Sequence, residues 1–311
     1  MKVDFEFGSL NGKRSVVAVG CFDGVHTGHL SILERVKKIA HESGLVSLVA
    51  SFEPHPREVL SGQSPLLLSP KDERTYLLKA QGIGAHALIT FDKEMASMGA
   101  SDYIEAVLID KLRAQTIVVG YDHRFGRNRE GDTDLLRTVG SKHGITVVEA
   151  AEASLRGAKI SSSSIRDKLA EGEVATAAQL LGRLYSFQGT VVHGDGRGKS
   201  IGIPTANLQS AFAHKLVPQN GVYAVYVEVE GIAGRFGGMM NIGTRPTFNN
   251  GSSVTLEVHI LNFDRDIYDR EVRVEFVERI RNEQKFASVA HLMEQLNLDQ
   301  ERCNGLLKEI L

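Results

Sequence analysis

The sequence contains little cysteine, no long hydrophobic run and no excess of either charge. Of its 311 residues, only Cys21 and Cys303 are cysteines. Two are too few for a disulfide framework, and they predict free thiols in a reducing cytoplasm. Lysine and arginine total 36, against 38 for aspartate and glutamate. Because there is no basic surplus to neutralise a phosphate backbone, DNA and RNA are poor candidates for a partner.

The longest apolar stretches, such as Ser15–Val19 and Leu66–Leu68, are far too short to span a bilayer. The segment Met1–Gly8 carries Asp4 and Glu6 and lacks the apolar centre of a secretory signal. Apolar residues make up 42% and charged residues 24%, which excludes a disordered or fibrous chain. We therefore expect a soluble, cytoplasmic protein of about two domains, without a membrane partner.

The first half of the sequence alternates between apolar, β-branched runs and stretches with helical spacing. The predicted strands are Arg14–Gly20, Leu45–Phe52, His86–Phe91, Thr116–Gly120 and Gly144–Glu149. The predicted helices are His29–Ser43, Pro70–Gln81, Ala100–Arg113 and Asp132–His143. Apolar strands separated by helices form βαβ units, so we expect an α/β domain with a five-stranded parallel sheet. Ligands of such sheets bind at the carboxyl ends of the strands.

The pattern changes near residue 183. Before it, Ser161–Leu181 predicts two helices separated at Gly172. After it, the predicted strands are Tyr185–Val192, Val222–Glu230, Arg235–Ile242, Val254–Leu261 and Glu271–Val277. Most of them alternate between apolar and polar residues, and Gln284–Leu311 returns to helical spacing. We therefore expect an α/β domain over residues 1–182, followed over residues 183–311 by a β-barrel with a C-terminal helix.

The segment Gly20–His29 (GCFDGVHTGH) follows the first predicted strand. Its glycines allow tight turns, and Gly28 and His29 begin a helix whose N-terminus favours an anion. His26 and His29, three residues apart, can present two imidazoles to one phosphate. The competing interpretation is a metal site, but no third ligand has suitable spacing.

Three further segments carry polar or rigid residues at strand or helix ends. Phe52–Pro56 (FEPHP) holds the chain extended through two prolines, either to line a pocket or as a rigid loop. Gly120–Gly126 (GYDHRFG) combines an acid, a base and aromatic rings suited to a planar ligand. Ile160–Arg166 (ISSSSIR) offers four hydroxyls at a helix start, then a guanidinium one turn after Ser162, which favours a polyphosphate clamp over a simple helix cap.

Together these four segments resemble the nucleotidyltransferases with an HxGH turn, and in detail the FMN adenylyltransferase module of bacterial FAD synthetases. HxGH alone would also fit other adenylyltransferases or cytidylyltransferases. The resemblance implies a Rossmann-like fold and a catalytic role for His26, His29 and Arg166. It implies ATP binding by Gly20, Phe22, Asp23, Gly24, Ser162, Ser163 and Ser164. It implies flavin binding by Phe52, Pro54, His55, Pro56, Asp122 and Phe125. Position 123 departs from the family, which more usually has phenylalanine where this chain has His123.

The segment His193–Asn207 (HGDGRGKSIGIPTAN) is the richest in glycine in the second half. It nearly matches a Walker A loop, but the spacing is one residue short, and Gly202 and Pro204 exclude the helix that must follow. The alternative is a backbone cradle for phosphates, with oxygen ligands for Mg²⁺ from Thr205 and Asn207.

This loop, with the segments GVY (221–223), NIGTRPTF (241–248) and LEVHIL (256–261), is similar to riboflavin kinase. The resemblance implies Mg²⁺ binding by Thr205 and Asn207 and a catalytic role for Glu257. It implies ATP binding by Gly194, Gly196, Gly198 and Asn241, and flavin binding by Arg245, Arg281 and Phe286. Without the resemblance, Glu257 would be taken as an exposed residue on a strand. The turn Tyr268–Arg270 (YDR) departs from the family's Tyr-Gly-Lys.

The two resemblances predict an enzyme that phosphorylates riboflavin to FMN and then adenylylates FMN to FAD, with ATP as co-substrate and Mg²⁺ as cofactor. Riboflavin, FMN and ATP are the expected small-molecule partners, and self-association stays open. One alternative is a different adenylyltransferase with an accessory barrel, which would accept nicotinamide mononucleotide. Another is a catalytically silent flavin-binding module, which would be expected to lack some motif residues.

Overall fold

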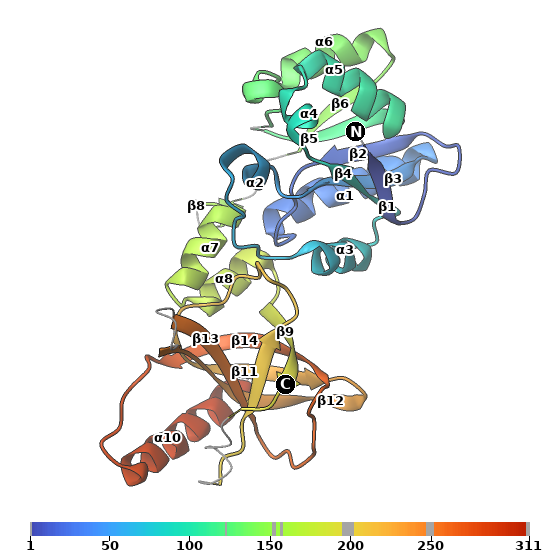
Figure 1. Ribbon diagram of the computed structural model, residues 1–311. Helices are drawn as coiled ribbons and strands as arrows, with labels where there is room; N and C mark the ends of the chain where they lie inside the picture. Colours follow the sequence, from blue (N-terminus) through green and yellow to red (C-terminus); the bar gives the residue numbers. More distant parts are fainter. Residues whose placement is uncertain are drawn as a thin grey trace. The chain divides into compact units, whose positions relative to one another are not determined.

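The computed structural model describes residues 2–121, 123–150, 154–155, 158–194, 202–246 and 252–308. The chain forms two compact units, Met1–Ser162 and Ser163–Leu311. Each unit has its own sheet (Figure 1). Helices α7 (Ser162–Ala170) and α8 (Val174–Leu181) are separated at Gly172, as predicted, and α8 packs against strands of the second unit.

The first unit contains a six-stranded sheet in the order β1–β4–β3–β2–β5–β6. Its strands are β1 (Val3–Phe7), β2 (Ser15–Val19), β3 (Val46–Glu53), β4 (Ala85–Thr90), β5 (Ala114–Gly120) and β6 (Thr146–Ala150). The five predicted strands are present and parallel, which confirms the α/β prediction. The predicted strand count was wrong, because β1 pairs with β4 as an antiparallel edge strand. A short hairpin, β7 (Ser154–Leu155) and β8 (Ala158–Lys159), follows the sheet.

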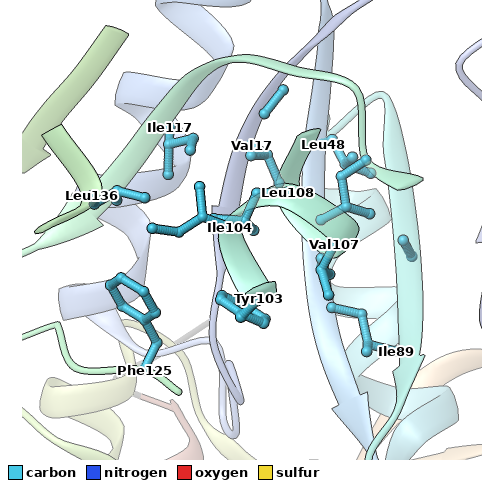
Figure 2. Close-up of a cluster of buried hydrophobic side chains, with 14 of the residues drawn as sticks. Val17, Leu48, Ile89, Tyr103, Ile104, Val107, Leu108, Ile117, Phe125 and Leu136 are labelled. Carbon is cyan, nitrogen blue, oxygen red and sulfur yellow. The ribbon is translucent and has the colours of Figure 1, made fainter. Parts of the chain in front are cut away.

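Helices cover both faces of this sheet, so β2 contributes to two hydrophobic cores. Val16 and Ala18 pack in the core that includes residues of α1 and α3, whereas Val17 packs in the opposite core. Figure 2 shows this second core, which is closed by residues of α5, η1 and α6. The helices are α1 (Thr27–Ser43), α2 (Pro56–Ser61), α3 (Lys71–Ala80), α4 (Lys93–Ser97), α5 (Ala100–Tyr103) and α6 (Thr133–Lys142). The segment predicted as a single helix over Ala100–Arg113 continues from α5 as the π-helical η1 (Ile104–Lys111).

The second unit contains a closed barrel in the order β10–β13–β12–β11–β14–β9. Its strands are β9 (Tyr185–Val192), β10 (Ala206–Ser210), β11 (Gly221–Val229), β12 (Ile232–Pro246), β13 (Ser252–Ile260) and β14 (Glu271–Arg281). The barrel and the helix α10 (Val289–Lys308) confirm the prediction, and α10 packs on β11, β12 and β14. The sequence analysis missed β10, in which only Leu208 is buried. Among the described residues, no helix combines the length and apolar character that a membrane span requires.

A polar cluster centred on the buried ring of His86 lies between β3, β4 and α3. The ring of His86 is 0% exposed, with its Nε2 2.8 Å from Oγ of Ser51 and its Nδ1 3.2 Å from Oγ1 of Thr75. Burial, together with the positive charges of Arg74 and Lys71, lowers the pKa of His86 from 6.5 to about 3. His86 is therefore neutral in the folded protein at any physiological pH.

We expect this cluster to make the first unit sensitive to acid. Below pH 6.5 the unfolded chain binds a proton at His86 that the folded chain does not, so stability falls as pH falls from 6.5 toward 3. At pH 5.5 this linkage costs about 1.4 kcal/mol relative to neutral pH. His86→Gln keeps a hydrogen-bonding side chain without a titrating group. Urea unfolding at pH 7.5 and 5.5 should show a smaller pH effect for this variant, and an equal effect would contradict the assignment.

Candidate active sites

The turn between β2 and α1 is strained and closed by two histidines. Phe22, Gly24 and Val25 have φ values of 48°, 84° and 39°. A β-branched residue such as Val25 adopts positive φ only where the surrounding structure enforces it, and such strain concentrates at functional turns. The backbone N–H of His29 donates to Nδ1 of His26 at 3.3 Å, and the N–H of His26 donates to Nδ1 of His29 at 3.3 Å. The two side chains therefore cap α1 reciprocally.

This capping determines where the histidine protons lie. Because Nδ1 of each ring accepts a hydrogen bond, the proton of each neutral ring is on Nε2. The rings of His26 and His29 stack with centroids 3.6 Å apart. Gly28 makes room for this arrangement, since a Cβ there would lie 3.1 Å from Cε1 and Nδ1 of His26. The turn thus presents two ordered imidazoles at a helix N-terminus.

The histidines line a cleft of about 490 Å³ between the ends of β2 and β5. This is where the strand order reverses, and ligands of open α/β sheets bind at such a switch point. Of the residues predicted for this site, Gly20, Phe22, His26, His29 and Ser162 line the cleft. The sequence analysis did not assign Cys21, Ile32, Tyr121, Arg124 and Arg129, which also line it. Arg124 lies inside the segment that follows β5, so its positive charge could have identified it as a site residue from the sequence.

Asp23 and Gly24, predicted to bind ATP, belong to the turn but do not line this cleft. Asp23 is 1% exposed. Its carboxylate accepts the N–H groups of Leu68 at 3.1 Å and Ser69 at 2.8 Å, and the N–H of Gly24 donates to Oγ of Ser69 at 2.6 Å. The backbone carbonyl of Asp23 accepts a hydrogen bond from Oγ of Ser162 at 2.8 Å. Asp23 therefore connects the turn to the start of α7.

None of the described residues that were predicted to bind flavin in the first unit lines this cleft. Phe52 packs edge-on against Phe91, with ring centroids 5.4 Å apart. Pro54 follows a cis peptide bond, and His55 caps α2 by accepting the N–H of Arg57 at 3.1 Å, with Pro56 as the first helical residue. Phe125 is only 8% exposed and belongs to the core in Figure 2.

The polar residues after β5 form an ordered group at the edge of the cleft. NH1 of Arg124 lies 3.2 Å from Oδ2 of Asp132, which caps α6. The backbone N–H of Leu135, and next the charge of Arg124, lower the pKa of Asp132. The ring of His123 stacks on Phe125 at 5.6 Å. His123 thus packs against an aromatic ring, and the phenylalanine that is usual in the family at this position could make the same contact.

In the barrel, three residues that the sequence analysis assigned separately form one row. Asn207 on β10 is the cross-strand partner of Glu257 on β13, and Glu257 is the partner of Asn241 on β12. Directly opposed residues of antiparallel strands point to the same face of a sheet. All three are half-buried. A carboxylate with an amide on either side therefore lies on one face of the barrel.

Gly194 is required by the side chain of Asn207. A Cβ at position 194 would overlap the amide group of Asn207. The glycine thus allows the backbone at position 194 to lie against a member of the row of polar residues. Gly196, Gly198 and Asp122 lie outside the described residues, as does the side chain of Arg245.

Thr205, the other predicted Mg²⁺ ligand, lines a second cleft of about 340 Å³. Its walls combine apolar and aromatic residues with the charged residues 264–266, and the apolar and aromatic ones include Val191, Pro204, Phe263, Ile267 and Tyr268. The ring of Tyr268 stacks on His193 with centroids 4.0 Å apart. Such a cavity suits a flat heteroaromatic base. Sequence reasoning missed Phe263 and Ile267, which stand in a turn without a motif.

Asp269 explains the departure from the family in the turn after this cleft. Its φ is 61°, in the left-handed region where glycine is favoured and aspartate is tolerated. The family's glycine and this chain's aspartate therefore serve the same backbone conformation.

Arg281 and Phe286, predicted to face the flavin, lie together at the end of β14 and in the segment that follows it. The guanidinium carbon of Arg281 is 5.7 Å from the centroid of Phe286. Among the described residues, no group of three or more His, Cys, Asp or Glu side chains is arranged to hold a metal ion.

Comparisons with known proteins cover both units. A family model described as FAD synthetase matches residues 9–164, and one described as riboflavin kinase matches residues 181–307. A bifunctional riboflavin kinase/FMN adenylyltransferase of Pseudomonas fluorescens is 37% identical over 94% of this chain and 92% of its own length. The protein of the same name from Escherichia coli K12 is 37% identical over 92% and 90%. A crystal structure of a Streptococcus pneumoniae chain named as a macrolide-efflux protein is 33% identical, with a TM-score of 0.88 and 96% of each chain covered.

Proposed function

The chain belongs to the family of bifunctional riboflavin kinase/FMN adenylyltransferases, and on this premise we propose which residues carry out its two reactions. The enzyme uses ATP twice, first to phosphorylate riboflavin to FMN and then to adenylylate FMN to FAD. The reciprocal pair of His26 and His29 in the first cleft, and the row of Asn207, Glu257 and Asn241 on the barrel, are the observations that support the proposed sites.

In the first unit, an oxygen of the FMN phosphate attacks the α-phosphorus of ATP. The bond from that phosphorus to the oxygen bridging to the β-phosphate breaks, and pyrophosphate leaves. The attacking oxygen is already an anion, so no general base is needed. Catalysis then depends on positioning and charge stabilisation. The Nε2 donors of His26 and His29, with the first N–H groups of α1, supply that stabilisation.

The first residue of α7, Ser162, belongs to the proposed ATP site. Ser162 lines the cleft and is hydrogen-bonded to the carbonyl of Asp23. Ser163 and Ser164 follow in the first turn of α7, and Arg166 comes one helical turn after Ser162. The N-terminus of a helix, together with a guanidinium, is suited to binding a polyphosphate. We propose that Arg166 stabilises the negative charge that develops on the leaving pyrophosphate.

In the barrel, the terminal ribityl hydroxyl of riboflavin attacks the γ-phosphorus of ATP. Glu257 accepts the hydroxyl proton, the bond between the γ-phosphorus and the β–γ bridging oxygen breaks, and ADP leaves. Asn241 and Asn207 flank Glu257 and orient the phosphates. The cleft beside Thr205 holds the adenine ring.

The residues Thr205 and Asn207 fit Mg²⁺. They offer a hydroxyl and an amide oxygen, and Mg²⁺ commonly takes one or two protein ligands together with substrate phosphates and water. When bound, the ion supplies charge neutralisation on the ATP phosphates. Gly194 leaves space for the side-chain amide of Asn207, because a Cβ at position 194 would overlap it.

The two reactions are proposed to belong to residues 1–182 and 183–311, although α7 and α8 are attached to the barrel unit. We expect the fragment Ser163–Leu311 to phosphorylate riboflavin with Mg²⁺ and ATP but to make no FAD, because it lacks both histidines. Chromatographic separation of the flavins measures both products. A second test concerns substrate choice. The full chain, supplied with nicotinamide mononucleotide in place of FMN, should release no pyrophosphate. A fragment that unfolds cooperatively yet phosphorylates nothing would contradict the assignment.

A further inference from the structure

Two arginines line the first cleft from the segment that follows β5, and they differ in how they are paired. The guanidinium of Arg124 lies 3.2 Å from the carboxylate of Asp132, so its charge is offset within the protein. Arg129 is exposed, and its side chain makes no hydrogen bond or ion pair with any residue in the described part of the chain. Arg129 therefore brings an unpaired positive charge to the cleft that contains His26 and His29.

The acidic residues nearest to this cleft are paired with other arginines. An adjoining cleft of about 480 Å³ shares Arg129 with the first one and is also lined by Asp134 and Glu149. Arg137 pairs with both carboxylates, at 3.2 Å from Asp134 and 2.6 Å from Glu149. Among the described residues that line the two clefts, the guanidinium available to an anionic ligand is thus that of Arg129.

Arg129 stands in a strained loop that the fold holds in place. Asn128 and Arg129 have φ values of 53° and 60°, in the left-handed region that residues with a Cβ disfavour. Phe125 and Gly131 exchange backbone hydrogen bonds of 3.2 and 2.9 Å, which closes the loop at its base. The carboxylate of Glu130 also accepts the backbone N–H of the first residue of α5 at 2.9 Å. Such strain persists only where the surroundings impose it, so the fold fixes the backbone from which Arg129 extends.

The two walls of the first cleft rest on opposite faces of the sheet. Phe22, in the turn that carries the histidines, packs in the core that includes residues of α1 and α3. Phe125, at the base of the loop that carries Arg129, packs in the opposite core (Figure 2). Ser162 belongs to the wall of the turn, because its Oγ donates to the carbonyl of Asp23. Arg129 and Ser162 thus line the cleft from opposite sides.

This separation suits a reaction in which two phosphate groups must meet. In phosphoryl transfer, the attacking and leaving oxygens lie roughly in line, on opposite sides of the phosphorus. The pyrophosphate is proposed to leave on the side of Ser162, so the phosphate of FMN enters from the side of Arg129. A phosphate monoester carries a charge of about −1.5 to −2 at pH 7 and is repelled by the phosphates of ATP. A guanidinium offsets such a charge and donates two parallel hydrogen bonds to the phosphate.

We propose that Arg129 binds the phosphate group of FMN and holds it for attack on the α-phosphorus of ATP. The phosphate oxygen forms the new bond to phosphorus while pyrophosphate leaves, and Arg129 keeps its proton throughout. The inference rests on the proposed adenylyltransferase function of the first unit. It goes beyond that function by giving the entering FMN and the leaving pyrophosphate separate cations, Arg129 and Arg166.

The experiment measures FAD formation from FMN by full-length variants, with the concentrations of FMN and ATP varied in turn. Arg129→Gln should raise KM for FMN by about 10- to 100-fold, the range for loss of a hydrogen bond to a charged group. KM for ATP should stay within about twofold of the wild type, because removing a contact to one substrate leaves the binding of the other intact. Arg127→Gln is the matched control, since Arg127 is an exposed arginine of the same loop that lines neither cleft. Both of its KM values should stay near those of the wild type.

Two further measurements separate phosphate binding from damage to the fold. Arg129→Gly removes the side chain but suits the positive φ at this position. This variant should melt no lower than the wild type and should raise KM for FMN as much as Arg129→Gln does. Lumiflavin has the flavin ring without the ribityl phosphate, so it should compete with FMN equally well in the wild type and in Arg129→Gln.

An unchanged KM for FMN in Arg129→Gln or Arg129→Gly would overturn the proposal, as would an equal rise in Arg127→Gln or weaker competition by lumiflavin. A rise in KM for ATP instead of FMN would also overturn it, because Arg129 would then bind the triphosphate. A wild-type enzyme that made no FAD from FMN would refute the proposed adenylyltransferase function itself.

Discussion

Replacing both His26 and His29 with alanine should abolish FAD formation from FMN and leave FMN formation from riboflavin near the wild-type rate. Loss of one donor to a developing charge typically costs about 10²–10³-fold in rate, and loss of both costs more. The two imidazoles cap the same helix and stack on one another, so we expect the single variants to be almost as impaired as the double variant. Separate assays with FMN and with riboflavin, each analysed by chromatography, measure the two activities.

The capping role of these histidines requires its own control. Losing an N-cap costs about 0.5–2 kcal/mol, so the double variant should also melt at a lower temperature. His26→Asn keeps a good N-cap residue but removes the Nε2 donor. Its melting temperature should therefore stay closer to that of the wild type, while FAD formation is still lost. His41→Ala, at the exposed C-terminal end of the same helix, should change neither activity. Equal losses of FAD and FMN formation in the double variant would indicate misfolding or one shared site.

Patterns within a single element were readable from the sequence, including the alternation of strands and helices and the turn that carries both histidines. The edge strand β1 was missed, although its sequence carries a strand pattern. Val3, Phe5 and Phe7 alternate with Asp4 and Glu6, which is the pattern of a half-exposed strand. Strand β10 was not readable, because it contains one buried apolar residue and overlaps a segment rich in ligand-type residues.

Contacts between segments that are far apart in the sequence could not be predicted. A charged residue in a glycine-rich turn is expected to bind a ligand, yet the carboxylate of Asp23 is occupied by backbone N–H groups 45 and 46 residues away. The row on the barrel depends on the register of three strands, and a shift of one residue in any of them would place its side chain on the other face. Neither hydropathy nor spacing along the chain determines that register for Glu257.

Glu257 is the residue for which the register matters most. Taken alone, a glutamate in an alternating strand is an exposed, structurally neutral residue. On β13 it lies between Asn207 and Asn241, half-buried, on the face of the barrel that also carries Val222 and α10. A carboxylate between two amides is well placed to accept a proton from a hydroxyl held near the phosphates of ATP. Its neighbours would orient it without competing for that proton.

Glu257→Gln should therefore lower kcat for riboflavin phosphorylation by about 10²–10⁴-fold, the range for loss of a general base. KM for ATP should change little, since Thr205, Asn207 and the loop after β9 are proposed to hold the nucleotide. Glutamine keeps the shape of the side chain, so the melting temperature should be close to that of the wild type. FMN supplied directly should be adenylylated at the normal rate, because that reaction uses the first unit. If the variant phosphorylated riboflavin at the wild-type rate, Glu257 would be a surface residue of the strand, and another group would have to accept the proton.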